Sequence, residues 1–422
     1  MKFFKILLIL IYSLCANFQA NAAISVIAKS DEFIVKIKKN RLFFLPNANQ
    51  IGSSSFYLLK TKSKSSIVSV RSKLKTLNSD VEYIEPNYIY HSTDTTYGKS
   101  VVNDVDFREN WNLQNLYSKN ADIHIVDLWR EGIVGNQKTI VAIIDSGIDY
   151  HHPDLKKNIY TNSKEIPDNG IDDDGNGYID DIHGWNFVDN NSNANDDNGH
   201  GTHCAGTIGA EANNSFGIAG INWNVSILPL KFLDSQGYGE TKNAILAIEY
   251  ARKMGAKIIN ASWGGDPFSQ ALSDAIQEAN SDNILFVTSA GNNGMNNDLT
   301  PFYPASLNLP NVISVAASNE SDKIANYSNY GQKSVHISAP GNNIFSTALQ
   351  DGFETLSGTS MAAPHISGIA ALLISQEPNL TPALIKERLI KSSDPVNVIG
   401  RVNAYNAVHR HYPIKNTRMK HK

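Results

Sequence analysis

Three residues that could together hydrolyse an amide bond stand far apart in the sequence. Asp145 ends the apolar run TIVAIID, His200 lies in the glycine-rich stretch NGHGTHCAGT, and Ser360 lies in SGTSMAAPH. A serine hydroxyl becomes a competent nucleophile when a histidine takes its proton and an aspartate orients that histidine. Taken singly, each residue also has an ordinary structural explanation, as a turn aspartate, a core histidine or a helix N-cap.

The local sequence around each residue indicates an element that could position it. Asp145 follows a strand-like run, and Ser360 begins a helical pattern whose free N–H groups would favour a developing oxyanion. Glycines beside His200 permit a sharp entry into a helix. His200 and His203 could also be a core pair or a metal pair, but their spacing of three does not match the i, i+4 helical zinc motif.

Apolar strand-like runs alternate with helical patterns over most of the chain. The strand candidates are 139–145, 226–233, 256–263, 283–290, 311–318 and 335–340, and the helical patterns are 241–254, 269–280, 360–376 and 382–391. Near-continuous apolar strands between helices predict an α/β fold, with an open, mostly parallel sheet and helices on both faces. Such sheets place working groups at the carboxyl ends of their strands.

The N-terminal part of the chain predicts a separate, smaller domain. Strand patterns at 32–38, 55–59 and 81–90 and a helical pattern at 66–77 indicate a small α+β unit over 24–91. This unit is basic, whereas residues 103–408 carry 18 Lys and Arg against 35 Asp and Glu. Opposite charges predict that the two parts attract each other, and an acidic body makes nucleic acid a poor partner.

The first 22 residues have the layout of a secretory signal peptide. Lys2 and Lys5 precede an apolar run, and Ala20 and Ala22 give a small-x-small exit. The apolar run is shorter than the roughly 20 residues of a spanning helix. We therefore expect an exported protein, extracellular or periplasmic, with no integral membrane segment after processing. Cys204 is then the one cysteine left, so an internal disulfide is impossible.

In this chain order, the segments DSGID, HGTHCAGT and GTSMAAPH resemble the signature segments of the subtilisin-like serine proteases. The resemblance covers Asn103 to about Val408. It implies that Ser360 attacks the scissile carbonyl, that His200 transfers the proton and that Asp145 orients the imidazole. His203 and His365 match family positions outside the triad and are expected to be structural.

The resemblance extends to the groups that would stabilise and bind a substrate. Asn292 in SAGNNG matches the family's oxyanion-hole asparagine, with the Ser360 N–H as second donor. The segment formed by Ser262, Trp263, Gly264 and Gly265 resembles the strand that pairs with an extended substrate, and residues 237–239 are a weaker candidate for the facing strand. Trp263 and Phe302 could each line a side-chain pocket or belong to the core.

An acidic loop has the oxygen-ligand spacing of a calcium site. Its candidate ligands, at positions 1, 3, 5 and 9 of DDDGNGYIDDIH, are Asp172, Asp174, Asn176 and Asp180. Position 12 departs from the pattern, because His183 stands where a bidentate Glu is usual. Asp181 could supply the missing ligand in its place. The alternative is a solvated acidic loop. Many carboxylates without a cation would repel one another, which favours structural Ca²⁺.

A second calcium site is implied by the resemblance alone. Asp154 and Asn214 match ligands of the family's usual structural calcium, with carbonyl oxygens completing the site at Ala212, Phe216 and Ile218. We expect no catalytic metal and no organic cofactor.

VEYIEPNYIYH (81–91) is similar to the closing strand of the family's propeptides. The implied organisation is a signal peptide (1–22), an inhibitory and chaperoning propeptide (24–91), a linker with the maturation cleavage (92–102), a catalytic domain (103–408) and a basic tail (409–422). The implied function is a secreted serine endopeptidase made as a self-processing zymogen and expected to be monomeric. Its partners would be extended polypeptide substrates and its own propeptide. The alternative is a catalytically silent binding protein on a protease fold.

Overall fold

The computed structural model describes residues 28–38, 48–51, 55–61, 70, 74, 80–88, 101–116, 118, 121–396 and 399–409. The chain divides into two compact units, 1–97 and 98–422. The predicted signal peptide, most of the predicted helix 66–77, the stretch 92–100 and the tail beyond residue 409 lie outside the described residues.

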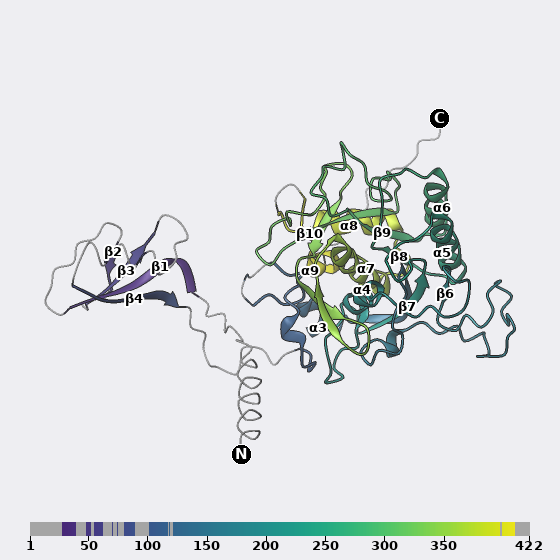
Figure 1. The fold of residues 1–422 in the computed structure, drawn as a ribbon, viewed down its shortest axis with the longest axis horizontal. Helices are drawn as coiled ribbons and strands as arrows, with labels where there is room; N and C mark the ends of the chain where they lie inside the picture. Colours follow the sequence, from purple (N-terminus) through teal and green to yellow (C-terminus); the bar gives the residue numbers. More distant parts are fainter. Residues whose placement is uncertain are drawn as a thin grey trace, which may run out of the picture. The chain divides into compact units, whose positions relative to one another are not determined.

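The first unit is built on an antiparallel sheet of four strands in the order β2-β3-β1-β4 (Figure 1). The strands are β1 Ala28–Ile37, β2 Ala48–Gln50, β3 Phe56–Lys60 and β4 Val81–Tyr88. Alternate residues of β1 are buried, at Phe33, Val35 and Ile37. This period of two gives a sheet with one buried face. The short β2 was not predicted, because three residues carry no periodic signal.

The second unit contains a seven-stranded sheet in the order β11-β10-β9-β8-β5-β7-β6, in which every neighbouring pair is parallel. Its strands are β5 Gly135–Asp145, β6 Trp185–Asn186, β7 Asn224–Lys231, β8 Ile258–Ala261, β9 Leu285–Ser289, β10 Val312–Ser318 and β11 Ile337–Pro340. A hairpin of β12 Ile344–Thr347 and β13 Phe353–Leu356 lies outside this sheet. The predicted α/β fold class is confirmed.

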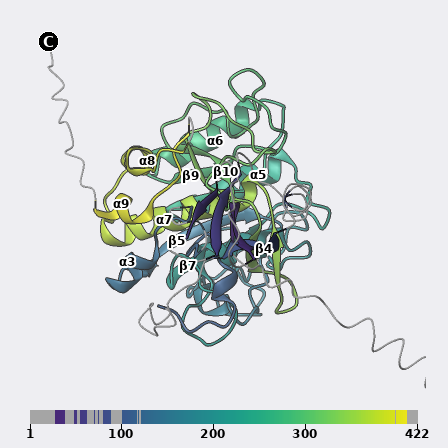
Figure 2. The same cartoon turned by 90° about the vertical axis from the view of Figure 1, so that its left-hand side faces the viewer.

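Helices cover both faces of this sheet. They are α3 Val126–Arg130, α4 His200–Gly209, α5 Thr241–Lys253, α6 Gln270–Ser281, α7 Thr359–Gln376, α8 Pro382–Ser392 and α9 Ala404–His409, with 3₁₀ turns η1 at Phe107–Glu109 and η2 at Lys156–Asn158. Figures 1 and 2 show α5 and α6 side by side, away from α7, α8 and α9. The two groups of helices pack into separate hydrophobic cores, one on each face.

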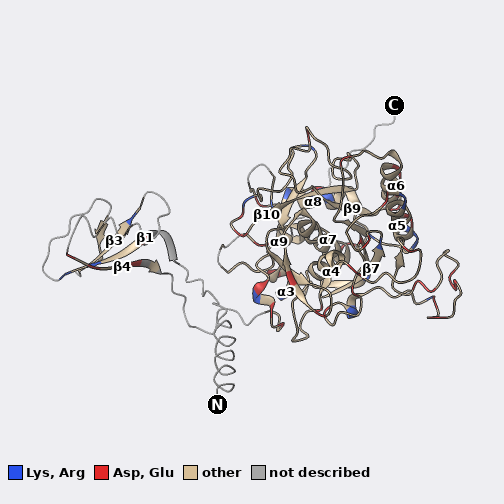
Figure 3. Cartoon of the chain, viewed as in Figure 1, with Lys and Arg blue, Asp and Glu red and all other residues tan. Residues whose placement is uncertain are grey.

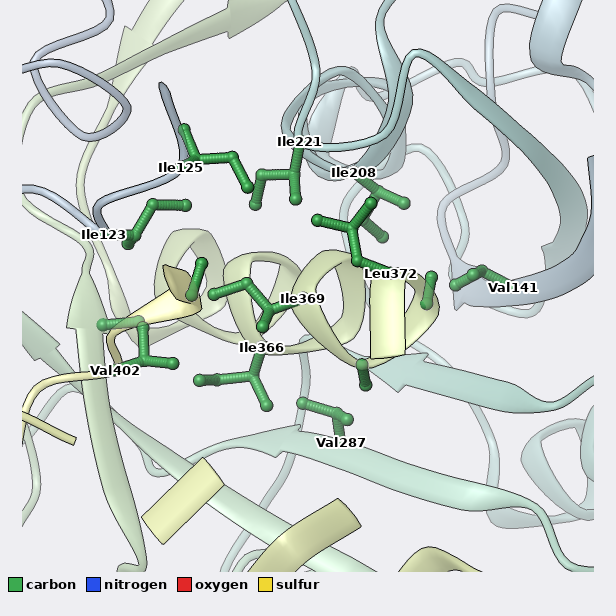
Figure 4. Packing of buried hydrophobic residues seen from close by; sticks show 14 of the residues in the cluster. Ile123, Ile125, Val141, Ile208, Ile221, Val287, Ile366, Ile369, Leu372 and Val402 are labelled. Carbon is green, nitrogen blue, oxygen red and sulfur yellow. The ribbon is translucent and has the colours of Figure 1, made fainter. Parts of the chain in front are cut away.

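Helix α7 runs through the larger of these cores. Figure 4 shows Ile366, Ile369 and Leu372 on α7 among apolar side chains of other elements, including Val287 of β9 and Ile208 of α4. A helix that is apolar all round is a buried helix. Surrounded in this way, α7 holds its N-terminal residues in a fixed place. Among the described residues, no helix combines the length and apolarity needed to cross a bilayer.

The strand order places a topological switch at the centre of the sheet. After β5 the chain forms β6 and then β7 on one side, and it returns to form β8 on the other side of β5. Ligands of open parallel sheets bind at the carboxyl ends of the strands beside such a switch. Asp145 ends β5 and Ser262 follows β8, so both lie at this edge.

Candidate active site

Asp145 and His200 form a hydrogen-bonded pair at the carboxyl edge of the sheet. The His200 Nδ1 atom lies 2.8 Å from Asp145 Oδ1, and the same oxygen accepts the backbone N–H of Ser146. Asp145 is fully buried, whereas 27% of the His200 side chain is exposed. A buried carboxylate on Nδ1 leaves the opposite ring nitrogen to work as a base.

The environment of His200 acts on its pKa in two opposing ways. Burial alone would lower the pKa, but the charge of Asp145 and its hydrogen bond outweigh burial and raise the pKa above the ordinary value of 6.5. The imidazolium form is therefore stabilised. A histidine that must hold a proton during a reaction benefits from such a partner.

Ser360 lies at the second position of α7, directly after the N-cap residue Gly358 and Thr359. The first N–H groups of a helix have no partner within the helix, so the Ser360 N–H is available to a ligand. Within the described residues, the Ser360 hydroxyl donates to the Ser262 carbonyl oxygen at 3.0 Å and forms no hydrogen bond with His200. Catalytic hydrogen bonds often form only when substrate is bound.

Cys204 connects the histidine helix to the serine helix. Its thiol lies one turn beyond His200 on α4 and 3.6 Å from the Ser360 carbonyl oxygen. Ligand atoms of Asp145, His200 and Cys204 lie within 4.8 Å of one another. Burial raises the pKa of the Cys204 thiol well above its usual value, so this cysteine remains a neutral, buried packing residue.

Pro364 explains why the Ser360 carbonyl is free to accept these contacts. Helix α7 begins at Thr359, which places Pro364 in its second turn. Without an N–H, the proline cannot bond the carbonyl four residues earlier, which belongs to Ser360. The Ser262 hydroxyl donates to that carbonyl instead, at 2.9 Å.

Asn292 is held beside Ser360 by a neighbour that the sequence analysis did not single out. The Thr359 N–H and the Thr359 hydroxyl donate to Asn292 Oδ1 at 2.8 and 2.9 Å. The Thr359 hydroxyl in turn accepts the Gly291 N–H at 3.1 Å. With its oxygen engaged in this way, the Asn292 amide presents its Nδ2 donor at the same helix end as the Ser360 N–H.

The segment from Ser262 to Gly265 leaves the end of β8 beside the nucleophile. Gly265 exchanges two backbone hydrogen bonds with Tyr303, so the backbone left for a substrate is that of Ser262 to Gly264. Trp263 donates to the Ile144 carbonyl and packs on Phe232, which places its indole against the core rather than in a pocket.

The weaker candidate for a facing strand, 237–239, does not form a strand. Asp234 accepts the backbone N–H groups of Gln236 and Tyr238, and the Tyr238 carbonyl accepts the Asp234 N–H. An aspartate that bonds the following amides closes a turn. Gly237, whose φ is 80°, therefore serves the turn.

Two other histidines have packing surroundings, as the resemblance implied. His203 Nε2 contacts the Ile344 carbonyl, and His365 lies between the Met361 carbonyl and the Asn112 amide. Burial lowers the pKa of each to about 4. Both rings therefore stay neutral near pH 7.

The acidic loop brings together a different set of groups from the one its spacing indicated. Carboxylate oxygens of Asp172, Asp174 and Glu165 lie within 4.8 Å of one another. Asp180 turns away to accept the Asn169 and Gly170 N–H groups. The Asn176 amide donates to Asp181, which is buried and also accepts from Asn162 and Tyr250. Three clustered carboxylates are hard oxygen donors, the kind that Ca²⁺ prefers.

Asp154 and Asn214 lie in contact, as the resemblance implied. Asn214 Nδ2 donates to Asp154 Oδ1 at 2.7 Å, and the Ile218 N–H donates to Asp154 Oδ2 at 2.9 Å. Burial, with a smaller contribution from the nearby charges of Asp104 and Glu211, raises the pKa of Asp154 to about 7, although the two hydrogen bonds act to lower it. A buried carboxylate crowded by other carboxylates is a group that a bound cation would suit.

Three residues at these sites were missed by the sequence analysis: Thr359, Glu165 and Asp104. Thr359 could have been found from the sequence, because it adjoins Ser360 and carries a hydroxyl that can form hydrogen bonds. Glu165 lies seven residues before the acidic loop, and Asp104 accepts the Asn213 and Asn214 N–H groups from far away in sequence. Neither acid carries a spacing signal, because only tertiary folding brings it to its site.

Comparison with known proteins agrees with this geometry. Residues 136–412 match the Subtilase family (peptidase S8). A thermophilic serine proteinase of Bacillus sp. (strain AK1) is 36% identical over 83% of this chain and 79% of its own length. Subtilisin-like protease 1 of Plasmodium berghei (strain Anka) is 34% identical over 92% of this chain and 69% of its own length.

One further relative matches this chain over a smaller part of its own length, and two solved structures are similar to it. The cell wall-associated protease of Bacillus subtilis (strain 168) is 34% identical over 88% of this chain, but this covers 38% of that protein. The solved structure of a cold-adapted subtilisin-like serine proteinase matches 72% of this chain and 96% of its own, with a TM-score of 0.51 and 28% identity. A structure from Pseudoalteromonas arctica matches 73% of this chain with a TM-score of 0.59 and 26% identity.

Proposed function

The chain belongs to the subtilase family and is a serine endopeptidase, and we propose that it works through Ser360, His200 and Asp145. The observation that carries this assignment is the 2.8 Å contact between His200 Nδ1 and the buried Asp145. One helical turn after His200, the Cys204 thiol contacts the Ser360 carbonyl oxygen, which places the histidine helix beside Ser360. The three groups come from β5, α4 and α7, which meet at the carboxyl edge of the sheet.

In the proposed reaction, His200 Nε2 takes the proton of the Ser360 hydroxyl while the serine oxygen attacks the scissile carbonyl. Asp145 keeps Nδ1 protonated and stabilises the imidazolium. The Ser360 N–H and the Asn292 Nδ2 donate to the oxyanion. His200 then protonates the leaving amine, an acyl-enzyme remains, and water attacks it with His200 again acting as base.

We propose that the extended backbone of Ser262 to Gly264 pairs with the substrate as an added strand. The carbonyl and N–H groups of this segment directly follow β8, at the sheet edge where Ser360 donates to the Ser262 carbonyl. Recognition through the main chain would let the enzyme accept many unstructured sequences.

The protein is further proposed to be exported and made as a zymogen. The first 22 residues support export, and the basic unit before the linker supports an intramolecular inhibitor that is cut off between residues 91 and 103. We also propose structural Ca²⁺. The residues that would hold it are Asp172, Asp174 and Glu165 in one site and Asp154 with Asn214 in the other, and bound Ca²⁺ would neutralise their clustered charge.

The test compares intact masses of the wild-type chain and Ser360→Ala, each expressed at full length with Ca²⁺. We expect only the wild type to lose the residues before about Asn103, because cleavage requires the Ser360 hydroxyl. Mixing trace wild type with Ser360→Ala then shows whether a second molecule can perform the cut.

The competing proposal is a catalytically silent binding protein. It would be favoured if both chains stay at full length while circular dichroism shows a folded protein and a fluorophosphonate leaves the wild type unlabelled. The hydrogen bonds at Asp145 and Asn292 favour the enzyme, because a binding surface has no need of them.

A further inference from the structure

We propose that Phe302 closes the pocket next to Ser360, so that this enzyme cleaves after small residues such as Gly, Ala and Ser. The inference rests on the proposed function and deepens it by naming the substrate class. It concerns the side chain of the residue just before the scissile bond.

The place of that side chain follows from the proposed reaction. The residue before the scissile bond supplies the carbonyl that Ser360 attacks and that Asn292 and the Ser360 N–H stabilise. Its side chain must therefore enter the space beside these donors. Two backbone segments border this space, one leaving β8 at Ser262 and one leaving β9 and ending at Asn292. Strands β8 and β9 are neighbours in the sheet, so the two segments emerge side by side.

The Phe302 ring lies between these two segments. A Cβ atom on Gly264 would be 2.4 Å from Phe302 Cε1, and a Cβ atom on Gly291 would be 3.1 Å from Phe302 Cδ1. The ring is thus in contact with the backbone of both glycines, one on each bordering segment. Phe302 is only partly buried, so part of its side chain remains accessible at the surface.

The chain around Phe302 holds the ring in this position. The Phe302 N–H donates to the Ser306 hydroxyl at 3.1 Å, and the Phe302 carbonyl accepts the Ser306 N–H at 2.8 Å. The next residue, Tyr303, exchanges two backbone hydrogen bonds with Gly265. These bonds fix the backbone that carries the ring, and the two glycine segments that the ring contacts restrict its rotation.

A filled space of this kind selects by size. A glycine, alanine or serine side chain needs little of the space that the ring occupies, whereas a phenylalanine or leucine side chain would need the same volume. Close-packed interiors do not accommodate both. Large side chains would therefore be rejected in the transition state, where the carbonyl must reach the oxyanion donors.

The test measures kcat/KM on peptides that differ only in the residue before the scissile bond: Gly, Ala, Leu or Phe. The full-length chain is allowed to mature, and active sites are counted by fluorophosphonate labelling. We expect the wild type to prefer Ala over Phe by about 100-fold, and Phe302→Ala to raise the Phe-to-Ala ratio by about 10-fold or more. Phe302→Leu should give an intermediate ratio.

Phe268→Ala is the matched control. Its ring packs on Tyr303 and is 53% exposed, so its removal should leave the ratio unchanged. The proposal is overturned if the wild type cleaves the Phe peptide as well as the Ala peptide, or if both Phe302 variants keep the wild-type ratio. Should Phe302→Ala fail to mature, the wild-type profile and Phe302→Leu decide. A wild type that is neither labelled nor active on any peptide refutes the proposed function itself.

Discussion

The carboxyl edge of the sheet and the acidic loop both contain aspartates, but the two regions differ in how they bury and bond them. At the edge, Asp145 is buried, ends a central strand and bonds one histidine. In the loop, Asp172 and Asp174 stand on irregular backbone, partly exposed, and accept N–H groups of that same loop. Figure 3 shows acidic positions in red along the loop that projects at the right of the view.

This difference shows what each region needs in order to keep its shape. Strand ends, helix starts and protein hydrogen bonds position His200, Ser360 and Asn292. The loop collects carboxylates whose mutual repulsion a bound cation would relieve. We therefore expect substitutions at the edge to act on the rate of reaction and changes at the loop to act on stability.

Apart from loss of the Ser360 nucleophile itself, the largest effect is expected from Asn292→Ala. Loss of one oxyanion donor should lower kcat by about 10²–10³-fold with little change in KM, because the donor acts on charge that develops in the transition state. Thr359→Val, which removes the hydroxyl that orients Asn292, should lower kcat by a smaller factor, about tenfold.

Steady-state kinetics on one peptide substrate would measure both variants. Asn293→Ala serves as the control. Among the hydrogen bonds of the described residues, Asn293 donates to Asn329 through its backbone N–H, which the substitution to alanine keeps. A rise in KM with kcat intact for Asn292→Ala would place Asn292 in ground-state binding and contradict its proposed role.

A second prediction concerns removal of calcium from the mature wild-type enzyme. Chelation with EDTA should lower the free energy of unfolding by about 3 kcal/mol relative to Ca²⁺ at 100 times its dissociation constant or above. Denaturant unfolding in the two conditions measures this difference. Asp172→Asn and Asp154→Asn should each shrink it.

Asp274→Asn on α6 is the control, because it removes one negative charge outside the proposed calcium sites. Among the hydrogen bonds of the described residues, the Asp274 side chain accepts from Gln270 on the helix surface. Identical unfolding curves with EDTA and with Ca²⁺ would show that the carboxylate clusters hold no stabilising ion.

The contrast between the two regions also explains what the sequence could predict. Long periodic runs gave β5, β7 to β11 and α5 to α8 close to their observed bounds, because buried strands and helices leave a repeated apolar pattern. Asp145 and Ser360 were identifiable because each stands in a distinctive segment at one end of such a run, and His200 because it lies in a distinctive glycine-rich segment.

The directions of the side chains in the acidic loop could not be predicted from the spacing of its residues. Asp180 has a backbone φ of 53°, and its carboxylate turns to cap Asn169 and Gly170 rather than facing Asp172. Glu165 takes a place in the carboxylate cluster from outside the twelve-residue pattern. Phe302 could be weighed as core or pocket, but only folding places its ring between Gly264 and Gly291.

The smallest expected effect is the position of the acid limb in the pH profile. The His200 pKa is raised above 6.5 by Asp145, and only the neutral ring can take the Ser360 proton. As pH falls through this pKa, the ring becomes protonated and kcat/KM should fall with the slope of a single proton. The midpoint should lie above 6.5. His203 and His365, whose pKa values burial lowers to about 4, should add no second limb in this range.

Measuring kcat/KM against pH at a saturating Ca²⁺ concentration and at one near its dissociation constant sharpens the comparison between the regions. The midpoint should be the same at both concentrations, because the loop carboxylates do not contact His200, whose charged neighbours are Asp145 and Asp196. A midpoint below 6.5 would mean that burial outweighs Asp145. A midpoint that moves with Ca²⁺ would show that the loop and the sheet edge are electrostatically coupled, against the division of roles argued above.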